Sequence, residues 1–315
     1  MTVRDDLHPT PTAEPPVTAD PRVGVVVASK DRRDVLLRTL PRHLALPERP
    51  RVVLVDDASG DGTADAVAGE LPDVEVLRLS RSRGGAARNV GTAAIGTDYV
   101  AFCDDDSWFD PGALRAAADL FDRHPRLAVI NARILVGEEE RLDAICEEMA
   151  RSPLPRAPGQ PGHPLLSFVA CAVVVRREAF LGSGGFHERF GVGGEEELVG
   201  WELAARGWQM SYVPEIVAHH HPPRAGAPRP QRREIGIRNT LWTTWLRRPV
   251  RAAAARTARD LRRFPADLVT VRGLARAVAG IPFVLRERRT SPAHVEHQRR
   301  LLEDQQLSSR SRRYL

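Results

Sequence analysis

Three absences narrow the class of protein before any motif is considered. The chain has three cysteines in 315 residues, Cys103, Cys146 and Cys171, and their spacing matches no metal-binding pattern, so we expect reduced thiols in a cytosolic protein. No apolar run approaches the roughly 18 residues of a membrane-spanning helix, which predicts no transmembrane helix. Residues 1–20 lack an apolar signal core, and we expect a disordered tail there.

Lysine is nearly absent: Lys30 is the only one, and arginine carries the remaining positive charge. Residues 222–315 contain 22 arginines and 7 acidic residues, a net charge of +15, which leaves −10 for residues 1–221. Such asymmetry indicates that the basic part meets something anionic. The default interpretation is a solvated helical face. The alternative is peripheral contact with an anionic membrane, at the inner face of the plasma membrane. We expect no nucleic acid partner, since no recognised motif accompanies the charge.

What is present is a regular alternation of elements. Apolar runs predict buried strands, and helical patterns separate them. The expected strands are residues 22–28, 51–55, 74–79, 99–103 and 127–136, with helices at 34–44, 63–71, 86–95 and 111–121. Further strands are expected at 164–175 and 209–213, a helix at 195–206, and a loop with one short helix at 137–163. After a Pro/Arg-rich linker at 222–230, helices are expected at 232–246, 250–263, 266–285 and 293–306. Such alternation is typical of βαβ units around a mostly parallel sheet.

Polar clusters follow four of these strands. They lie at residues 29–31, 56–57, 83–88 and 104–106. Because ligands of open α/β sheets sit outside the carboxyl ends of the strands, four clusters at one edge predict a nucleotide-type site there.

Three adjacent carboxylates, Asp104, Asp105 and Asp106, end the fourth strand. Burying them unpaired would be unfavourable because they repel one another. Alternate residues Asp104 and Asp106 can both reach one Mg²⁺ or Mn²⁺, which prefer oxygen ligands, and such a cation would hold a diphosphate. The plain alternative is a solvated acidic turn before the helix at Pro111.

Five ordered motifs resemble those of glycosyltransferase family 2, whose members have a GT-A fold. They are V-G-V-V-V-A-S-K-D-R at 23–32, V-V-L-V-D-D-A-S-G-D-G-T at 52–63, R-G-G-A-A-R-N-V-G at 83–91, F-C-D-D-D-S-W at 102–108 and G-G-F-H-E-R-F-G-V-G-G-E-E-E-L at 184–198. The resemblance extends from Arg22 to about His221.

The resemblance implies roles on the donor side of the site. Residues expected to contact the base and ribose of a nucleoside diphosphate sugar are Ser29, Asp31 and Asp56 or Asp57. Arg88 would lie near the diphosphate or support Asp104. Asp104 and Asp105 would belong to the sugar-nucleotide site, and Asp104 and Asp106 to the metal site, with Asp106 as the preferred direct ligand.

The resemblance also implies a catalytic base and a further metal ligand. Glu196 falls where the family has the Asp of an E-D pair, the general base. Its additional methylene leaves Glu195 or Glu197 as alternatives, because a small displacement of a catalytic carboxylate changes the rate severely. His220, or its neighbours His219 and His221, falls where many members carry a histidine near the metal or acceptor.

The sequence therefore predicts an α/β protein with a GT-A, Rossmann-like, mostly parallel sheet flanked by helices. Residues 21–221 would form the catalytic domain and residues 222–315 a basic helical extension on the acceptor side or a membrane surface. The resemblance implies an inverting glycosyltransferase of cell-envelope polysaccharide synthesis that uses Mn²⁺ or Mg²⁺. Its acceptor hydroxyl would belong to a saccharide, a lipid-linked molecule or a small molecule, recognised by residues 137–163 and the C-terminal helices.

Two alternatives from other classes stay open. One is a nucleotidyltransferase on a related fold, although residues 29–32, S-K-D-R, lack the glycines of a phosphate loop after the first strand. The other is a catalytically silent module that binds a nucleotide sugar.

Overall fold

The computed structural model describes residues 19–222 and 230–308. The predicted N-terminal tail (1–20) and the predicted linker (222–230) lie almost entirely outside the described residues.

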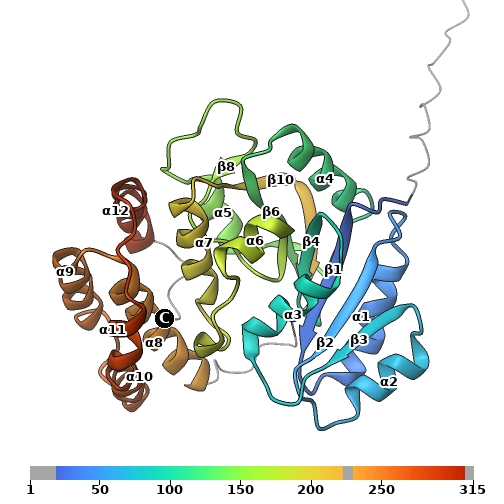
Figure 1. The fold of residues 1–315 in the computed structure, drawn as a ribbon, viewed down its shortest axis with the longest axis horizontal. Coiled ribbons are helices and arrows are strands. Elements are labelled where there is room, and N and C mark those ends of the chain that lie inside the picture. Colours follow the sequence, from blue (N-terminus) through green and yellow to red (C-terminus); the bar gives the residue numbers. More distant parts are fainter. Residues whose placement is uncertain (1–18, 223–229, 309–315) are drawn as a thin grey trace, which may run out of the picture.

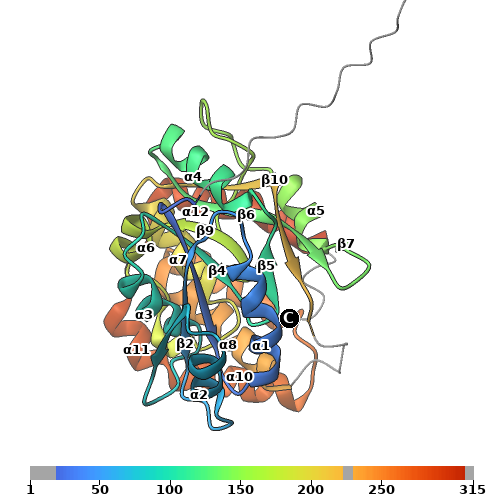
Figure 2. The same cartoon turned by 90° about the vertical axis from the view of Figure 1, so that its right-hand side faces the viewer.

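The first half of the sheet is parallel, as predicted. Strands β1 (Val23–Ser29), β2 (Arg51–Asp56), β3 (Val74–Arg78) and β4 (Tyr99–Cys103) lie in the order β3-β2-β1-β4. Helices α1 (Arg33–Leu44), α2 (Thr63–Glu70) and α3 (Ala87–Ala94) connect them. The valine-rich β1 is buried on both faces of the sheet, as parallel strands covered by helices must be. All four strands therefore end at the same edge (Figures 1 and 2).

The second half of the sheet is mixed. β9 (Ala172–Arg176) runs antiparallel to both β4 and β6 (Leu127–Val136), and β6 pairs in parallel with β10 (Gln209–His220). The three-residue strand β5 (Ser107–Phe109) pairs with the end of β10 and is too short to show a periodicity in the sequence. The remaining elements before the C-terminal helices are η1 (Gly84–Ala86), α4 (Ala113–Arg123), β7 (Arg141–Leu142), α5 (Ala144–Ala150), β8 (His163–Pro164), α6 (Arg177–Ser183), η2 (Glu188–Phe190) and α7 (Glu195–Ala205).

Two strand predictions were wrong in extent. The segment 164–175 is not one strand, because residues 165–171 are irregular and only β9 joins the sheet centre. The strand predicted to end at Val213 continues as β10 through Pro214 to His220, with a register shift between Val213 and Val217. A proline cannot donate to the ladder, but it is accommodated at such an irregularity. This continuation places His220 at the edge of the sheet where β1–β4 end.

The C-terminal region contains α8 (Pro230–Arg247), α9 (Val250–Leu261), α10 (Leu268–Ala279), α11 (Ile281–Glu287) and α12 (Ala293–Ser308). The single helix predicted at 266–285 is two helices bent by 47°. They break at Gly280, where a Cβ would overlap the Trp242 ring, and Pro282 lies in the first turn of α11. Figure 1 shows α9–α11 at the end of the molecule opposite α2, while α12 returns to pack on α7.

Candidate active site

Side chains at the end of β1 hold Asp105, the middle carboxylate of the acidic triplet Asp104–Asp106. The Ser29 hydroxyl donates to Asp105 Oδ2 at 2.7 Å, and Arg32 Nε donates to Asp105 Oδ1 at 3.2 Å. Arg32 also lies 3.6 Å from Asp106 Oδ2. Burial, and then repulsion from Asp106, raises the pKa of Asp105. Arg32, which sequence reasoning did not select, therefore joins β1 to the triplet.

The two carboxylates at the end of β2, Asp56 and Asp57, have different surroundings. Asp57 accepts from the Ser82 hydroxyl at 2.6 Å and from two backbone N–H groups, Arg83 at 2.6 Å and Gly84 at 3.0 Å. It therefore holds the turn before α3. Asp56 is buried, and its Oδ1 has no hydrogen-bond partner among the described residues. A buried acceptor without a donor is unfavourable, so Asp56 is the better placed of the two to bind a ligand.

Asp31 lies at the outer rim of the same edge. It is exposed, adopts a left-handed φ of 54° and accepts from the Gly60 N–H at 2.7 Å. Its backbone N–H donates to the Ser59 hydroxyl at 2.9 Å. These bonds join the loops after β1 and β2, which fixes the rim.

The buried guanidinium of Arg88 on α3 pairs with Asp104 at the end of β4. Ser107 supports this strand end, because its hydroxyl accepts from the Asp104 N–H at 2.8 Å and donates to the Cys171 carbonyl at 2.7 Å. Arg88 therefore occupies the position that the resemblance implied, next to Asp104.

The end of β10 brings His220 to the triplet, with its Nε2 3.3 Å from Asp106 Oδ1. Burial disfavours the charged imidazole, but the hydrogen bond to Asp106 raises the pKa of His220 overall. Ligand atoms of Asp104, Cys171 and His220 all lie within 4.8 Å of one another. This donor set suits one divalent cation. Burial raises the pKa of the Cys171 thiol far above its usual range, and the ligands that suit Mg²⁺ and Mn²⁺ are oxygens rather than a neutral thiol. Asp104 and His220 of this cluster, with Asp106 in contact with His220, are therefore the residues that would hold the ion.

The other two histidines of the run have different surroundings. His219 lies 2.6 Å from Asp110 and 3.3 Å from Glu140 through its two nitrogens, and its ring stacks on Trp108. Trp108 in turn packs under Arg42. The His221 N–H donates to the Asp106 carbonyl at 2.8 Å. Of the three, only His220 presents its ring nitrogen to an Asp106 carboxylate oxygen.

The three consecutive glutamates at the start of α7 also have three environments. Glu195 is buried and accepts from the Gly193 N–H, while Glu197 pairs with the buried Arg299 of α12 at 3.3 Å. Glu196 forms no ion pair or hydrogen bond with another side chain among the described residues. Burial, and then repulsion from Glu195, raises the pKa of Glu196 to about 8. An unpaired carboxylate with a raised pKa is suited to accept a proton.

Close glycine contacts hold this glutamate loop against η1, at the carboxyl edge of the sheet. The Gly85 N–H donates to the Gly191 carbonyl at 2.9 Å, and a Cβ on Gly85 would lie 2.7 Å from Glu195 Oε1. From the other side, Asn239 of α8 donates to the Phe190 and Gly193 carbonyls at 2.9 and 2.7 Å. The loop is thus clamped between η1 and the C-terminal helices.

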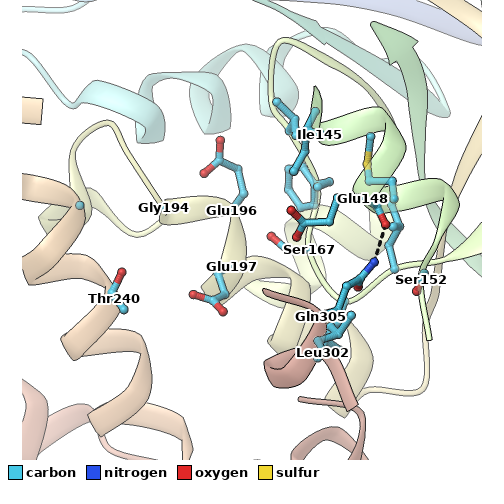
Figure 3. Close-up of a pocket in the computed structure, with 16 residues that line it drawn as sticks. Ile145, Glu148, Ser152, Ser167, Gly194, Glu196, Glu197, Thr240, Leu302 and Gln305 are labelled. Carbon is cyan, nitrogen blue, oxygen red and sulfur yellow. Dashed lines mark hydrogen bonds between the residues drawn. The ribbon is translucent and has the colours of Figure 1, made fainter. Parts of the chain in front are cut away.

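A pocket of about 280 Å³ opens beside Glu196. Its walls come from α5, the segment 165–169, the start of α7, α8 and α12. Figure 3 shows the carboxylates of Glu196 and Glu197 pointing in different directions, with Gln305 across the pocket from Thr240. Gln305 donates to the Glu148 carbonyl at 2.8 Å, which joins α12 to α5. No arginine or lysine lines this pocket within the part of the chain that the structure describes.

Sequence reasoning missed Arg32, Cys171 and the pocket. Arg32 could have been found, because it follows a strand end as Asp31 does. Cys171 lies 67 residues after Asp104 and 49 residues before His220, and no local spacing signals such a contact.

Comparison with known proteins gives a consistent result. Residues 24–182, half of the chain, match the family model described as glycosyl transferase family 2. The chain is 33% identical over 222 residues to pre-mycofactocin glycosyltransferase of Mycobacterium tuberculosis, covering 68% of this chain and 45% of that protein. It is 27% identical over 207 residues to N-acetylglucosaminyl-diphospho-decaprenol L-rhamnosyltransferase of the same species, covering 55% of this chain and 67% of that protein. The chain thus spans less than half the length of the first of these relatives.

Solved structures share the fold. Mannosyltransferase PcManGT from Pyrobaculum calidifontis, in complex with GDP-Man and Mn²⁺, matches with a TM-score of 0.56 and 19% identity over 96% of this chain and 79% of that chain. Residues 1–349 of Staphylococcus aureus TarS, in complex with UDP-GlcNAc, match with a TM-score of 0.53 and 17% identity over 71% of this chain and 66% of that one. These likenesses confirm the predicted GT-A fold.

Proposed function

The chain belongs to glycosyl transferase family 2, and from that premise we propose that it transfers a sugar from a nucleoside diphosphate sugar to an acceptor hydroxyl with inversion. The observation that carries the proposal is the environment of Glu196. Its carboxylate has no hydrogen-bond or ion-pair partner among the described residues, whereas Glu195 accepts from a backbone N–H and Glu197 pairs with Arg299. It also lies beside a pocket, on the loop clamped between η1 and α8.

In this mechanism the protein's own groups bind and orient the donor. Asp56 accepts from the nucleoside, Ser29 and Arg32 hold Asp105 in place, and Arg88 holds Asp104. Asp104, Asp106 and His220 would hold Mn²⁺ or Mg²⁺. When bound, that cation supplies positive charge that stabilises the departing diphosphate.

Glu196 then removes the proton from the acceptor hydroxyl. The hydroxyl oxygen bonds to the anomeric carbon, and the bond from that carbon to the diphosphate oxygen breaks, so the diphosphate leaves with the electron pair. Attack on the face opposite the leaving group inverts the anomeric configuration. A base with a pKa near the working pH is effective in such a step.

The acceptor occupies the 280 Å³ pocket in this proposal. Apolar residues from α5 and the segment 165–169 form much of its wall, and the charged residues that line it are glutamates. Since a pocket of this charge disfavours anions, the part of the acceptor seated there is uncharged. A saccharide, a lipid-linked molecule and a small molecule can each present such a part.

The test measures free nucleoside diphosphate released from a panel of nucleotide sugars with Mn²⁺, Mg²⁺ or EDTA. We expect metal-dependent release from one donor, and strongly reduced release in Asp106→Asn at the same metal concentration. Absence of release together with absence of nucleotide binding by calorimetry would overturn the donor site. Binding of a nucleotide sugar without turnover, even with acceptors supplied, would favour the silent binding module. Release of sugar 1-phosphate in place of the nucleoside diphosphate would favour the nucleotidyltransferase, because cleavage at the α-phosphate leaves the β-phosphate on the sugar.

A further inference from the structure

The C-terminal helices expose apolar side chains in a regular pattern. Along α10 and α11, one set of solvent-exposed positions that recurs every three or four residues is apolar: Leu268, Val271, Ala275, Val278, Pro282 and Leu285. The four large side chains of this set are 57–70% exposed. We call this set the apolar stripe. An apolar face toward water is costly and marks a site of interaction.

A second set of apolar side chains extends the stripe onto α9. Val250, Ala254, Ala258 and Leu261 are exposed at helical spacing. They line an open groove of about 540 Å³ between α9 and α11, together with Ile281 and Leu285. Because Leu285 belongs to both the stripe and the groove, the two form one continuous apolar surface.

The net charge around this surface is positive. Residues 250–289 contain ten arginines and three acidic residues. Each of the acidic side chains is paired: Asp260 with Arg256, Asp267 with Arg233 and Glu287 with His187. By contrast Arg251, Arg262 and Arg263 are exposed and form no ion pair among the described residues. An apolar face bordered by unpaired arginines is complementary to an anionic bilayer, with acyl chains for the apolar part and headgroups for the guanidinium groups.

We propose that the α9–α11 surface binds peripherally to an anionic lipid bilayer. No single helix in the described part of the chain has the length and composition to cross a membrane, whereas the bent pair α10–α11 has them together. The opposite face of α10 is packed on α8, where a Cβ on Gly273 would lie 3.0 Å from Ile237. Lipid cannot surround the pair without removing it from α8, so the pair lies in the interface plane. The proposal does not depend on the donor chemistry.

The experiment is flotation of the full chain with phosphatidylcholine vesicles, alone or with phosphatidylglycerol. We expect binding to the anionic vesicles only, weakened by salt. The triple variant Arg251→Gln, Arg262→Gln, Arg263→Gln should bind about 100-fold more weakly, since each arginine near the surface contributes about 1 kcal/mol. Its matched control removes the same charge elsewhere: Arg123→Gln, Arg126→Gln and Arg156→Gln, which are exposed on other elements. This control should lose binding only slightly.

A second variant tests the apolar part. Leu268→Glu with Leu285→Glu should weaken binding about tenfold or more by removing inserted methylenes, whereas Leu142→Glu, 48% exposed on β7, should not. Circular dichroism checks folding, and nucleoside diphosphate release without vesicles should be unchanged in all variants. Equal binding of the variants and the parent chain would overturn the proposal, as would binding to neither vesicle. A solution dimer that Leu268→Glu dissociates would assign the surface to a second copy of the chain.

Discussion

At the carboxyl edge of the sheet, acidic side chains outnumber the cations that face them, whereas each buried carboxylate described in the C-terminal helices is matched by arginine. Arg32 and Arg88 are the guanidinium groups paired with the Asp104–Asp106 triplet. In the C-terminal region, Glu234 faces Arg272 and Arg276, and Asp260 pairs with Arg256. Glu296 and Glu303 share the buried Arg248.

This difference separates charges that maintain the fold from charges that remain available to a ligand. A buried pair contributes little net stability, but losing one partner leaves an uncompensated charge. An unpaired buried carboxylate lowers stability and is expected where a ligand, cation or proton will compensate it. By this criterion Glu197 is structural and Glu196 is functional, although they are adjacent.

The largest effect should come from replacing the unpaired glutamate. Glu196→Gln should lower kcat about 1,000-fold, because a positioned general base contributes roughly 10²–10⁴-fold, while the donor KM changes little. Steady-state kinetics with donor and acceptor measures both. Glu197→Gln is the matched control. Its carboxylate pairs with the buried Arg299 and is not available to accept a proton, so kcat should fall far less than in Glu196→Gln. Similar losses of kcat in the two variants would show that Glu196 and Glu197 do not differ in function.

In the C-terminal helices, removing one partner of a buried charge pair should lower stability. Arg248→Ala should lower the free energy of unfolding by about 3–5 kcal/mol, because Glu296 and Glu303 would be left buried without their shared cation. Urea denaturation measures the change. Arg300→Ala, which removes an exposed partner of Glu296, should cost less than about 1 kcal/mol. A small effect at Arg248 would mean that these charges are not structural.

Removing a carboxylate from the cation site should weaken the metal response. Asp106→Asn should raise the Mn²⁺ concentration needed for half-maximal nucleoside diphosphate release about 100-fold, since it deletes a charged ligand. A titration of Mn²⁺ into EDTA-treated protein measures it. Asp110→Asn removes a nearby charge that faces His219 and should leave the Mn²⁺ requirement unchanged. An unchanged requirement in Asp106→Asn would place the cation elsewhere.

The smallest predicted effect concerns pH. Glu196 must be a carboxylate to accept a proton, and its pKa is raised to about 8. The active fraction therefore grows as pH rises, so kcat should increase about tenfold per pH unit below pH 7 and level off above pH 8. The residual rate of Glu196→Gln should lack this limb. A rise of kcat centred near pH 4.5 in the parent chain would show that Glu196 is not held in its neutral form.

The clustering of polar side chains at the carboxyl edge of the sheet was predictable, because strand ends in a parallel sheet meet at one edge wherever the intervening helices go. Ser29, Arg88 and the Asp104–Asp106 triplet follow from this rule and from the family resemblance. The rule does not distinguish Asp56 from Asp57, since only the conformation of residues 82–84 directs three donors to Asp57.

By itself, the sequence determined the alternation of strands and helices up to Cys103, the acidic edge and the basic C-terminal region, because these depend on local apolar periodicity and on composition. The tertiary structure decided which members of each polar run are available. His220 reaches Asp106 only because β10 continues past Pro214, and Glu196 is left unpaired because α12 supplies Arg299 to Glu197. Adjacent residues of one type look alike in a sequence, and only long-range packing gives each its own partners.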